Sequence, residues 1–419
     1  MEVIPVHHKP LLLLLLPTRT YRAGDFLAAA RRLDLEVVIG SDEPQALSDL
    51  SPLKSISLDF GCAEQAMHKI VVWAGKHPID AVVGVDDDTT ILATLVAKAL
   101  SLPHNSIEAA YATRDKHLLR TCLAAAGLST PWFKLLSIDE NPEDVVGSVN
   151  FPCVVKPLSL SASRGVIRAN GPKQFVDTFH RVVSILESSF QENGREGEEN
   201  WLLVEGFVPG AEVALEGIMV RGNLKVLAIF DKPDSMDGPF FEETIYITPS
   251  RLSCPIQQEI VDCTTAAAKA LGLREGPIHA ELRVNSESVC VLEIAARSIG
   301  GLCSRMMRFS TGISLEELII LHAIQHDVNP IEREERAAGV MMIPIPHLGI
   351  LRAVNGQTEA LTVKGIEEIT ITIPMGQRVV PLPEGKSYLG FIFARALTPN
   401  RVEVALREAH HRIGILIEQ

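Results

Sequence analysis

The sequence predicts a multidomain protein of the α/β and α+β classes. A doubly wound parallel sheet at the N-terminus is expected to precede two α+β units built on antiparallel sheet, and a small α+β cap to follow them. Three observations support this. Strand-like and helix-like segments alternate through residues 1–110, as in parallel sheets covered by helices. Strands with alternating polar and apolar residues begin at Trp201. Residues 337–419 carry further short strand-like pieces.

A chain of 419 residues is long enough for two to four structural units. We place the boundaries so that the units cover residues 1–110, 111–200, 201–336 and 337–419. The leucine run at residues 11–16 has six residues, whereas a bilayer span needs about 20. We therefore expect a buried first strand and no membrane association.

Smaller features mark the elements of the later units. Thr113 is expected to cap a helix that carries Lys116 and ends near Gly127. Residues 187–200 are charged and nearly free of apolar residues, which predicts an exposed loop, and residues 327–336 are typical of a linker. The strand at residues 202–205 is assigned to the third unit.

Composition excludes some function classes. The chain is 47% hydrophobic and 22% charged, with a net charge of −13 and no run of lysine or arginine. Nucleic-acid binding is not expected, because phosphate neutralisation needs a basic surface. Seven scattered cysteines without a CxxC motif indicate a reducing, cytoplasmic compartment and no zinc site.

Residues 278–297 read as a β-hairpin with a turn near residues 286–288. The predicted apolar face comprises Ile278, Ala280, Leu282, Val284, Cys290, Leu292, Ile294 and Ala296, and the polar face comprises His279, Glu281, Arg283, Glu293 and Arg297. A symmetric three-residue turn would place Glu281 opposite Glu293, with Cβ atoms about 5 Å apart. Facing carboxylates need a counter-ion, and Mg²⁺ favours carboxylate oxygens. The alternative is a solvated face on which the two arginines neutralise the glutamates.

Phosphate-binding groups are predicted around two lysines. Lys116 lies in the first turn of its helix, and Lys156 ends a strand before the loop 159–166, whose small residues let backbone N–H groups approach an anion. Taken alone, each lysine is more typical of an ordinary surface position. The residues 86–88, all aspartates, follow a strand end, where a helix cap is favoured over a ligand site.

The order of these features resembles the ATP-grasp superfamily. The resemblance spans residues 111–326 and rests on Lys116, Lys156, the loop 159–166, the segment VEGFVPGAE at 204–212, and a Glu281…Glu293-xxx-Arg297 pattern. The segments LEIAARSIGG at 292–301, DKP at 231–233 and FFEETIYITPS at 240–250 are most similar to the L-amino acid ligase branch, near carnosine-synthase-like and biotin-carboxylase-like enzymes. The C-terminal unit, residues 337–419, adds to this resemblance.

The resemblance implies a role for each matching position. The residues that it assigns to ATP are Lys116, Lys156, Ser161, Ser163, Gly165, Glu205, Phe207, Val208 and Glu212, with Glu212 near the ribose. It assigns Glu281 and Glu293 to Mg²⁺, for which Mn²⁺ is expected to substitute. The residues that it assigns to the amino acid pocket are Glu243, Tyr246, Arg297 and Gly301. Arg297, Lys156 and Glu243 are expected to take part in the chemistry.

The chain departs from the superfamily pattern at two positions. Ala295 stands where many members place an asparagine metal ligand, and Tyr246 stands where related ligases can have histidine. The resemblance implies an ATP-dependent carboxylate–amine ligase that forms an acyl phosphate and releases ADP and phosphate, with amino acids as substrates and a homodimeric assembly. The alternatives are a biotin-carboxylase-like or purine-biosynthetic ligase, and a non-catalytic nucleotide-binding subunit.

Overall fold

A computed structural model of the chain describes residues 9–43, 54–158, 160–193 and 200–419. The N-terminal unit is built on four parallel strands in the order β3-β2-β1-β4: β1 (Leu11–Leu15), β2 (Glu36–Ser41), β3 (Lys54–Ser57) and β4 (Ala81–Gly84). Three helices belong to it: α1 (Ala23–Arg32), α2 (Ala63–Ala74) and α3 (Asp87–Ala99). The predicted parallel sheet with a buried first strand is confirmed.

The leucine run is buried on both faces of this sheet. Leu12 and Leu14 pack in the core that contains Phe26 of α1, whereas Leu11, Leu13 and Leu15 pack in a second core with Ile70 of α2 and Val96 of α3. An uninterrupted apolar strand is expected where helices cover both faces of a parallel sheet.

The second sheet is antiparallel, in the order β5-β8-β6-β7. Its strands are β5 (Phe133–Ser137), β6 (Cys153–Pro157), β7 (Ile167–Ala169) and β8 (Trp201–Gly206), and its helices are α4 (Ile107–Ala112), α5 (Lys116–Ala125), α6 (Pro142–Val145) and α7 (Pro172–Asn193). The strand predicted at residues 202–205 was assigned to the third unit. It is part of β8 and belongs to the second unit, because β8 pairs with β5 and β6.

Two local predictions in this unit were wrong. Thr113 ends α4, and the cap of α5 is Asp115, whose carboxylate accepts from the backbone N–H groups of residues 117 and 118. The predicted loop from residue 187 is helical as far as Asn193, because α7 presents apolar residues such as Leu186 to the sheet at helical spacing. Residues 194–199 of that predicted loop lie outside the described part of the chain.

The largest sheet has eight strands in the order β13-β12-β9-β10-β11-β14-β18-β16. Its third-unit strands are β9 (Ala211–Val220), β10 (Asn223–Asp231), β11 (Ile245–Thr248), β12 (Gly276–Val284) and β13 (Val289–Ala295), and the helices of this unit are α8 (Cys254–Leu271) and α9 (Leu315–Ala323). One face packs on α8 in a core that includes Leu215, Ile260 and Leu282. The polar face of β9 and β12 carries the glutamates discussed below.

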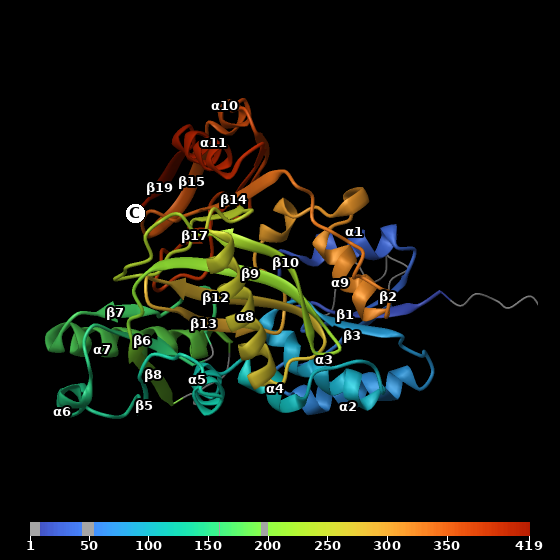
Figure 1. Ribbon diagram of the computed structural model, residues 1–419, viewed down its shortest axis with the longest axis horizontal. Helices are drawn as coiled ribbons and strands as arrows, with labels where there is room; N and C mark the ends of the chain where they lie inside the picture. The colour runs from blue at the N-terminus through green and yellow to red at the C-terminus, as the bar shows by residue number, and fades with distance from the viewer. Residues whose placement is uncertain (1–8, 44–53, 159, 194–199) are drawn as a thin grey trace, which may run out of the picture.

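The C-terminal unit, predicted as a small α+β cap, shares the large sheet. β14 (Ala337–Ile343), β18 (Gly390–Ala396) and β16 (Ile366–Ile371) extend the large sheet, because β14 pairs with β11. Only β15 (Gly349–Asn355), β17 (Arg378–Val379) and β19 (Gly414–Glu418) form a small sheet of their own within the described residues, beside α10 (Gln357–Leu361) and α11 (Pro399–His411). Figure 1 shows this part in red above the large sheet, with the N-terminal unit in blue and the second unit in green at its two lower ends.

The hairpin of β12 and β13 pairs Glu281 with Glu293, as predicted, but its turn and its strand register differ from the prediction. The turn is one residue longer than assumed, since Val284 faces Val289, and a bulge at Leu292 restores the pairing of the glutamates. Val291 therefore packs in the apolar core instead of Leu292 and Cys290, which corrects the predicted face.

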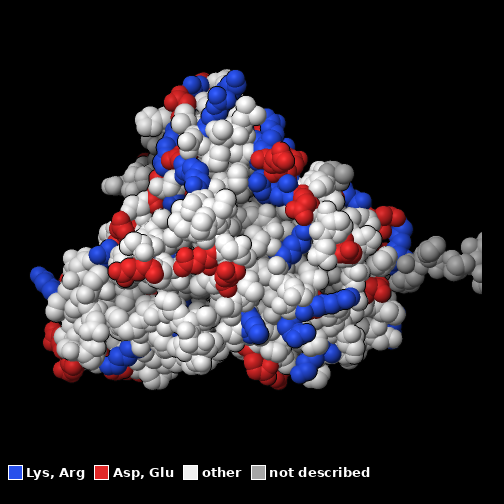
Figure 2. Space-filling model, in the orientation of Figure 1, with Lys and Arg blue, Asp and Glu red and all other residues white. Residues whose placement is uncertain are grey.

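Figure 2 shows lysine and arginine side chains interspersed with acidic and uncharged ones, so the displayed face carries no continuous basic patch among its described residues. In the described ranges, each helix is too short or too polar to cross a bilayer.

Candidate functional site

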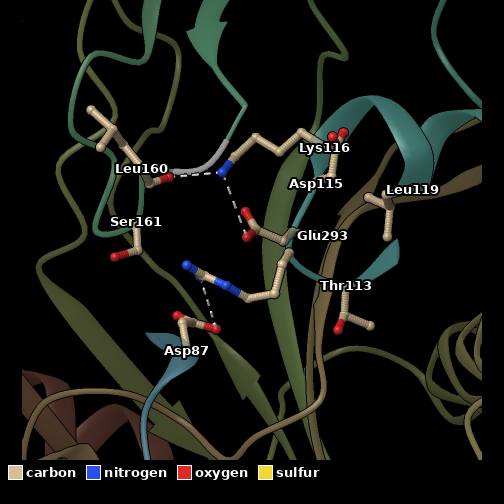
Figure 3. Close-up of a pocket in the computed structure, with 9 residues that line it drawn as sticks. Asp87, Thr113, Asp115, Lys116, Leu119, Leu160, Ser161 and Glu293 are labelled. Carbon is tan, nitrogen blue, oxygen red and sulfur yellow. Dashed lines mark hydrogen bonds and ion pairs between the residues drawn. The ribbon is translucent and has the colours of Figure 1, made fainter. Parts of the chain in front are cut away.

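A pocket opens where the first turn of α5 meets the loop after β6 and the hairpin strand β13 (Figure 3). The Lys116 Nζ donates to the carbonyl oxygen of Leu160 at 2.8 Å and lies 3.9 Å from Glu293 Oε1. Ser161 lines the same pocket from the loop. Three residues predicted to bind ATP or metal, Lys116, Ser161 and Glu293, are thus brought together from three elements.

The N-terminal unit contributes Asp87 to this pocket. Asp86 forms a capping box with Thr89 at the start of α3, as the helix-cap interpretation predicts. The next residue, Asp87, instead pairs with Arg297 at 2.8 Å and lies 3.8 Å from Arg114. Burial alone would raise the pKa of Asp87, but the two arginines outweigh it and hold the pKa at about 2. The predicted catalytic Arg297 is therefore fixed by a carboxylate of another unit.

A buried ion cluster joins the two predicted ATP residues Lys156 and Glu205. The Lys156 Nζ lies 2.5 Å from Glu205 Oε1, and Arg120 of α5 donates to the same carboxylate at 2.8 and 3.3 Å. Arg120 also donates to the carbonyl oxygens of Val291 and Leu292. Burial opposes the charge of Glu205, but its two cations hold its pKa at about 2. Burial, together with the nearby cations, lowers the pKa of Lys156 despite Glu205.

A second cluster gathers Glu212, Glu243 and Glu281, whose ligand atoms lie within 4.8 Å of one another. Lys232, directly after β10, stands among them: its Nζ lies 2.8 Å from Glu212 and 3.2 Å from Glu281, and also contacts Glu243. Glu212 was predicted to border the ribose. In the structure it lies beside Glu281, a predicted metal ligand, and Glu243, a predicted substrate residue.

The charges in this cluster are strongly coupled. Burial and the neighbouring Glu281 raise the pKa of Glu243 to about 7, against the effect of Lys232. The phenol of Tyr246 donates to Glu243 at 2.8 Å. Burial would raise the pKa of Glu281, but Lys232 and His279 lower it well below its ordinary range. Glu243 and Tyr246, both predicted to bind substrate, are therefore in direct contact.

His279 links the cluster to the buried Glu216 of β9. Its Nδ1 lies 2.9 Å from Glu216 and its Nε2 lies 3.7 Å from Glu281. Burial would lower the pKa of His279, but both carboxylates outweigh it and raise the pKa to about 9. Glu216 also accepts from the backbone N–H of Ile299, two residues before the predicted substrate residue Gly301.

The remaining predicted residues lie around these clusters. Ser163 adopts a left-handed backbone with a φ of 55°, and Gly165, with a φ of 72°, donates its N–H to the carbonyl oxygen of Pro383 at 3.0 Å. The ring of Phe207 stacks against that of Phe241. The Arg168 guanidinium lies 3.9 Å from the centre of the Phe207 ring.

Two further predicted positions, Val208 and Gly301, lie outside the ion clusters. Val208 is half-buried beside Phe207. Gly301 has a φ of 59°, and a Cβ there would lie 3.0 Å from the Phe391 ring. A side chain at position 301 would therefore strain the backbone and crowd that ring.

The donor set around β12 and β13 fits a hard divalent cation. Glu281 and Glu293 stand opposite each other on antiparallel strands, so their side chains leave the same face of the sheet. Each carboxylate also lies near an ammonium group, Glu281 near Lys232 and Glu293 near Lys116. Carboxylate oxygens are the ligands that Mg²⁺ prefers. Ala295, opposite His279, supplies no side-chain oxygen.

Sequence reasoning missed Arg120, Lys232 and the role of Asp87. The position of Asp87 at the carboxyl end of a parallel strand was a usable signal, because ligands gather at that edge. Lys232 lies in the DKP segment that supports the family resemblance, but no role was predicted for it. Arg120 carried no comparable signal, since its partner Glu205 lies far along the chain.

Comparisons with known proteins agree with this architecture. Residues 149–306 match the model of an ATP-grasp domain, and residues 341–418 match the L-amino acid ligase C-terminal domain 2. The crystal structure of L-amino acid ligase from Bacillus licheniformis is 26% identical, with a TM-score of 0.83, and the alignment covers 98% of this chain and 99% of that one. Phosphoribosylglycinamide synthetase from Anaerococcus prevotii shares the fold, with a TM-score of 0.70 and 15% identity over 98% of this chain and 100% of that one.

Curated relatives align over a smaller share of the chain. Alanine–anticapsin ligase from Bacillus subtilis is 26% identical over 274 residues, which is 61% of this chain and 56% of that protein. D-Alanine–D-alanine ligase from Aromatoleum aromaticum is 25% identical over 231 residues, which is 54% of this chain and 71% of that protein. The chain thus spans little more than half the length of the first of these relatives.

Proposed function

We propose that this chain, which carries an ATP-grasp domain and the C-terminal domain 2 of L-amino acid ligases, joins the carboxylate of one amino acid to the amine of another at the expense of ATP. The observation that carries the proposal is the pairing of Glu281 with Glu293, which lie near Lys232 and Lys116 respectively. This set combines metal ligands with cations suited to phosphate oxygens.

ATP would lie between the second and third units. Lys116 and Lys156 would bind its phosphates, and Ser161 and Ser163 would offer hydrogen-bond donors from the loop. Gly165, whose N–H is bonded to Pro383, would shape that loop. Phe207 and Val208 would border the adenine. Glu205 would act mainly by holding Lys156, since the contact between them is 2.5 Å. Mg²⁺ or Mn²⁺ would be held by Glu281 and Glu293, and would neutralise charge on the phosphates.

The substrate carboxylate would attack the γ-phosphorus, forming an acyl phosphate and releasing ADP. Arg297 would stabilise the transferring phosphoryl group, because its guanidinium matches two oxygens at once. The amine would then attack the acyl carbon, so that an amide forms and phosphate leaves. Glu243, which accepts a hydrogen bond from Tyr246, would bind the amino group, since a carboxylate pairs with an ammonium. Gly301 would leave room for the substrate.

The test is a screen for phosphate release over pairs of amino acids with ATP and Mg²⁺. We expect ADP and phosphate to form only when both substrates are present, and E293Q to lose turnover while it stays folded. Formation of AMP and pyrophosphate would exclude the proposal. ADP formation that needs bicarbonate instead of an amine would favour the biotin-carboxylase-like alternative.

A further inference from the structure

Lys232 occupies the place of a cation among three carboxylates. Its side chain is only 3% exposed, and it follows β10 in the segment Asp231–Lys232–Pro233. The backbone N–H of Lys232 donates to the carbonyl oxygen of Glu212, which fixes the lysine at both its backbone and its ammonium group. The ammonium contacts Glu212, Glu243 and Glu281 from three different elements.

Charges around the cluster are balanced without a metal. Beside Lys232, the guanidinium Nε of Arg283 lies 3.0 Å from Glu212, and His279 Nε2 lies 3.7 Å from Glu281. The cluster thus has one cationic partner or neighbour for each carboxylate. A divalent ion that entered it would meet an ammonium group about 3 Å from its ligands, and the repulsion between like charges at that distance is large in a buried site.

We propose that, without nucleotide, Lys232 is the resident cation of the Glu212–Glu243–Glu281 cluster, which keeps a divalent metal from bridging Glu212 and Glu243 and positions Glu243 and Glu281. This inference rests on the proposed function only where it concerns catalysis. Metal binding at Glu281 would then depend on Glu293 together with the nucleotide, and Lys232 is a positioning residue that acts through Glu243 and Glu281.

The experiment is a titration of nucleotide-free protein with Mn²⁺, followed by the electron paramagnetic resonance signal of the free ion. K232M removes the ammonium and should create a site for one Mn²⁺ per chain, at least about tenfold tighter than any in the wild type. K232R keeps the charge and should behave as the wild type. No ATP or amino acid is present, so an inactive protein could still support the inference.

A matched control is K225M. Lys225 lies on β10, and its Nζ lies 3.7 Å from Glu332, outside the cluster. K225M should leave Mn²⁺ binding unchanged. The effect of K232M can then be assigned to the Lys232 ammonium and not to the loss of a lysine in general. Adding E243Q to K232M should abolish the new site, and a site that persists there would overturn the inference.

Unchanged Mn²⁺ affinity in folded K232M would also overturn it. If circular dichroism shows that K232M does not fold, wild-type crystals soaked in Mn²⁺ without nucleotide decide the question. Anomalous scattering should give no peak within bonding distance of Glu212 and Glu243, and a peak there would refute the role of Lys232.

Discussion

The ion cluster of Arg120, Glu205 and Lys156 gives the most quantitative prediction. R120M removes two hydrogen bonds to Glu205 and leaves the carbonyl oxygens of Val291 and Leu292 without their donor. Breaking a buried ion pair by deleting one partner costs about 3–5 kcal/mol. The difference between the ordinary pKa of glutamate, 4.5, and about 2 for Glu205 corresponds to about 3 kcal/mol, which supports the lower part of this range.

Denaturant unfolding followed by tryptophan fluorescence measures this loss. Trp132 and Trp201 lie at the sheet that contains Glu205, so their emission reports on the relevant unit. R352M is a control, because Arg352 pairs with Glu418 at the exposed surface and its loss should cost less than about 1 kcal/mol. A loss below about 1 kcal/mol in R120M as well would refute the reasoning.

The same cluster predicts a dependence on pH with a defined sign. The pKa of Glu205 in the folded protein lies below its ordinary value, so its stabilisation is complete above about pH 4.5 and disappears as the pH falls toward 2. The stability difference between wild type and R120M should therefore shrink across this interval. A difference that stays constant down to pH 2 would contradict the assignment.

Three further predictions follow from the same contacts. D87N should lower kcat for phosphate release about tenfold, because Arg297 loses its charged partner, and an unchanged kcat would contradict this. H279Q should reduce Tm more at pH 6 than at pH 9.5, because pairing raises the pKa of His279 from 6.5 to about 9 and its stabilisation is lost as pH rises through 9; equal losses would refute this. G301A should cost about 1 kcal/mol or more, since its φ of 59° disfavours a side chain, and a neutral result would contradict the strain.

The sequence predicted what local patterns determine. Period-two alternation identified the polar face that holds Glu281 and Glu293, and the pairing was confirmed even though a bulge changed its route. The leucine run predicted a buried parallel strand because both of its faces are apolar. The order of these residue types also predicted a resemblance to the ATP-grasp superfamily, and residues 149–306 match the model of an ATP-grasp domain.

What the sequence did not predict depends on tertiary pairing. β8 is a short, mostly apolar segment typical of a buried strand, and nothing in its residues shows that it joins β5 and β6. Lys232 contacts Glu281 across 49 positions of the chain, and Arg120 contacts Glu205 across 85. The sequence also did not predict that the C-terminal unit shares the large sheet, because the residues of β14 and β11 do not show that these strands pair.

The central claim is that a carboxylate is activated by the γ-phosphoryl group of ATP at the pair Glu281 and Glu293. It is tested most directly with an amino acid whose carboxylate is labelled with ¹⁸O, used in the pair that releases phosphate fastest. Transfer through an acyl phosphate predicts one ¹⁸O atom in each phosphate released, measured by mass spectrometry, and none of this product from E293Q. Unlabelled phosphate, or label found in AMP, would contradict the account.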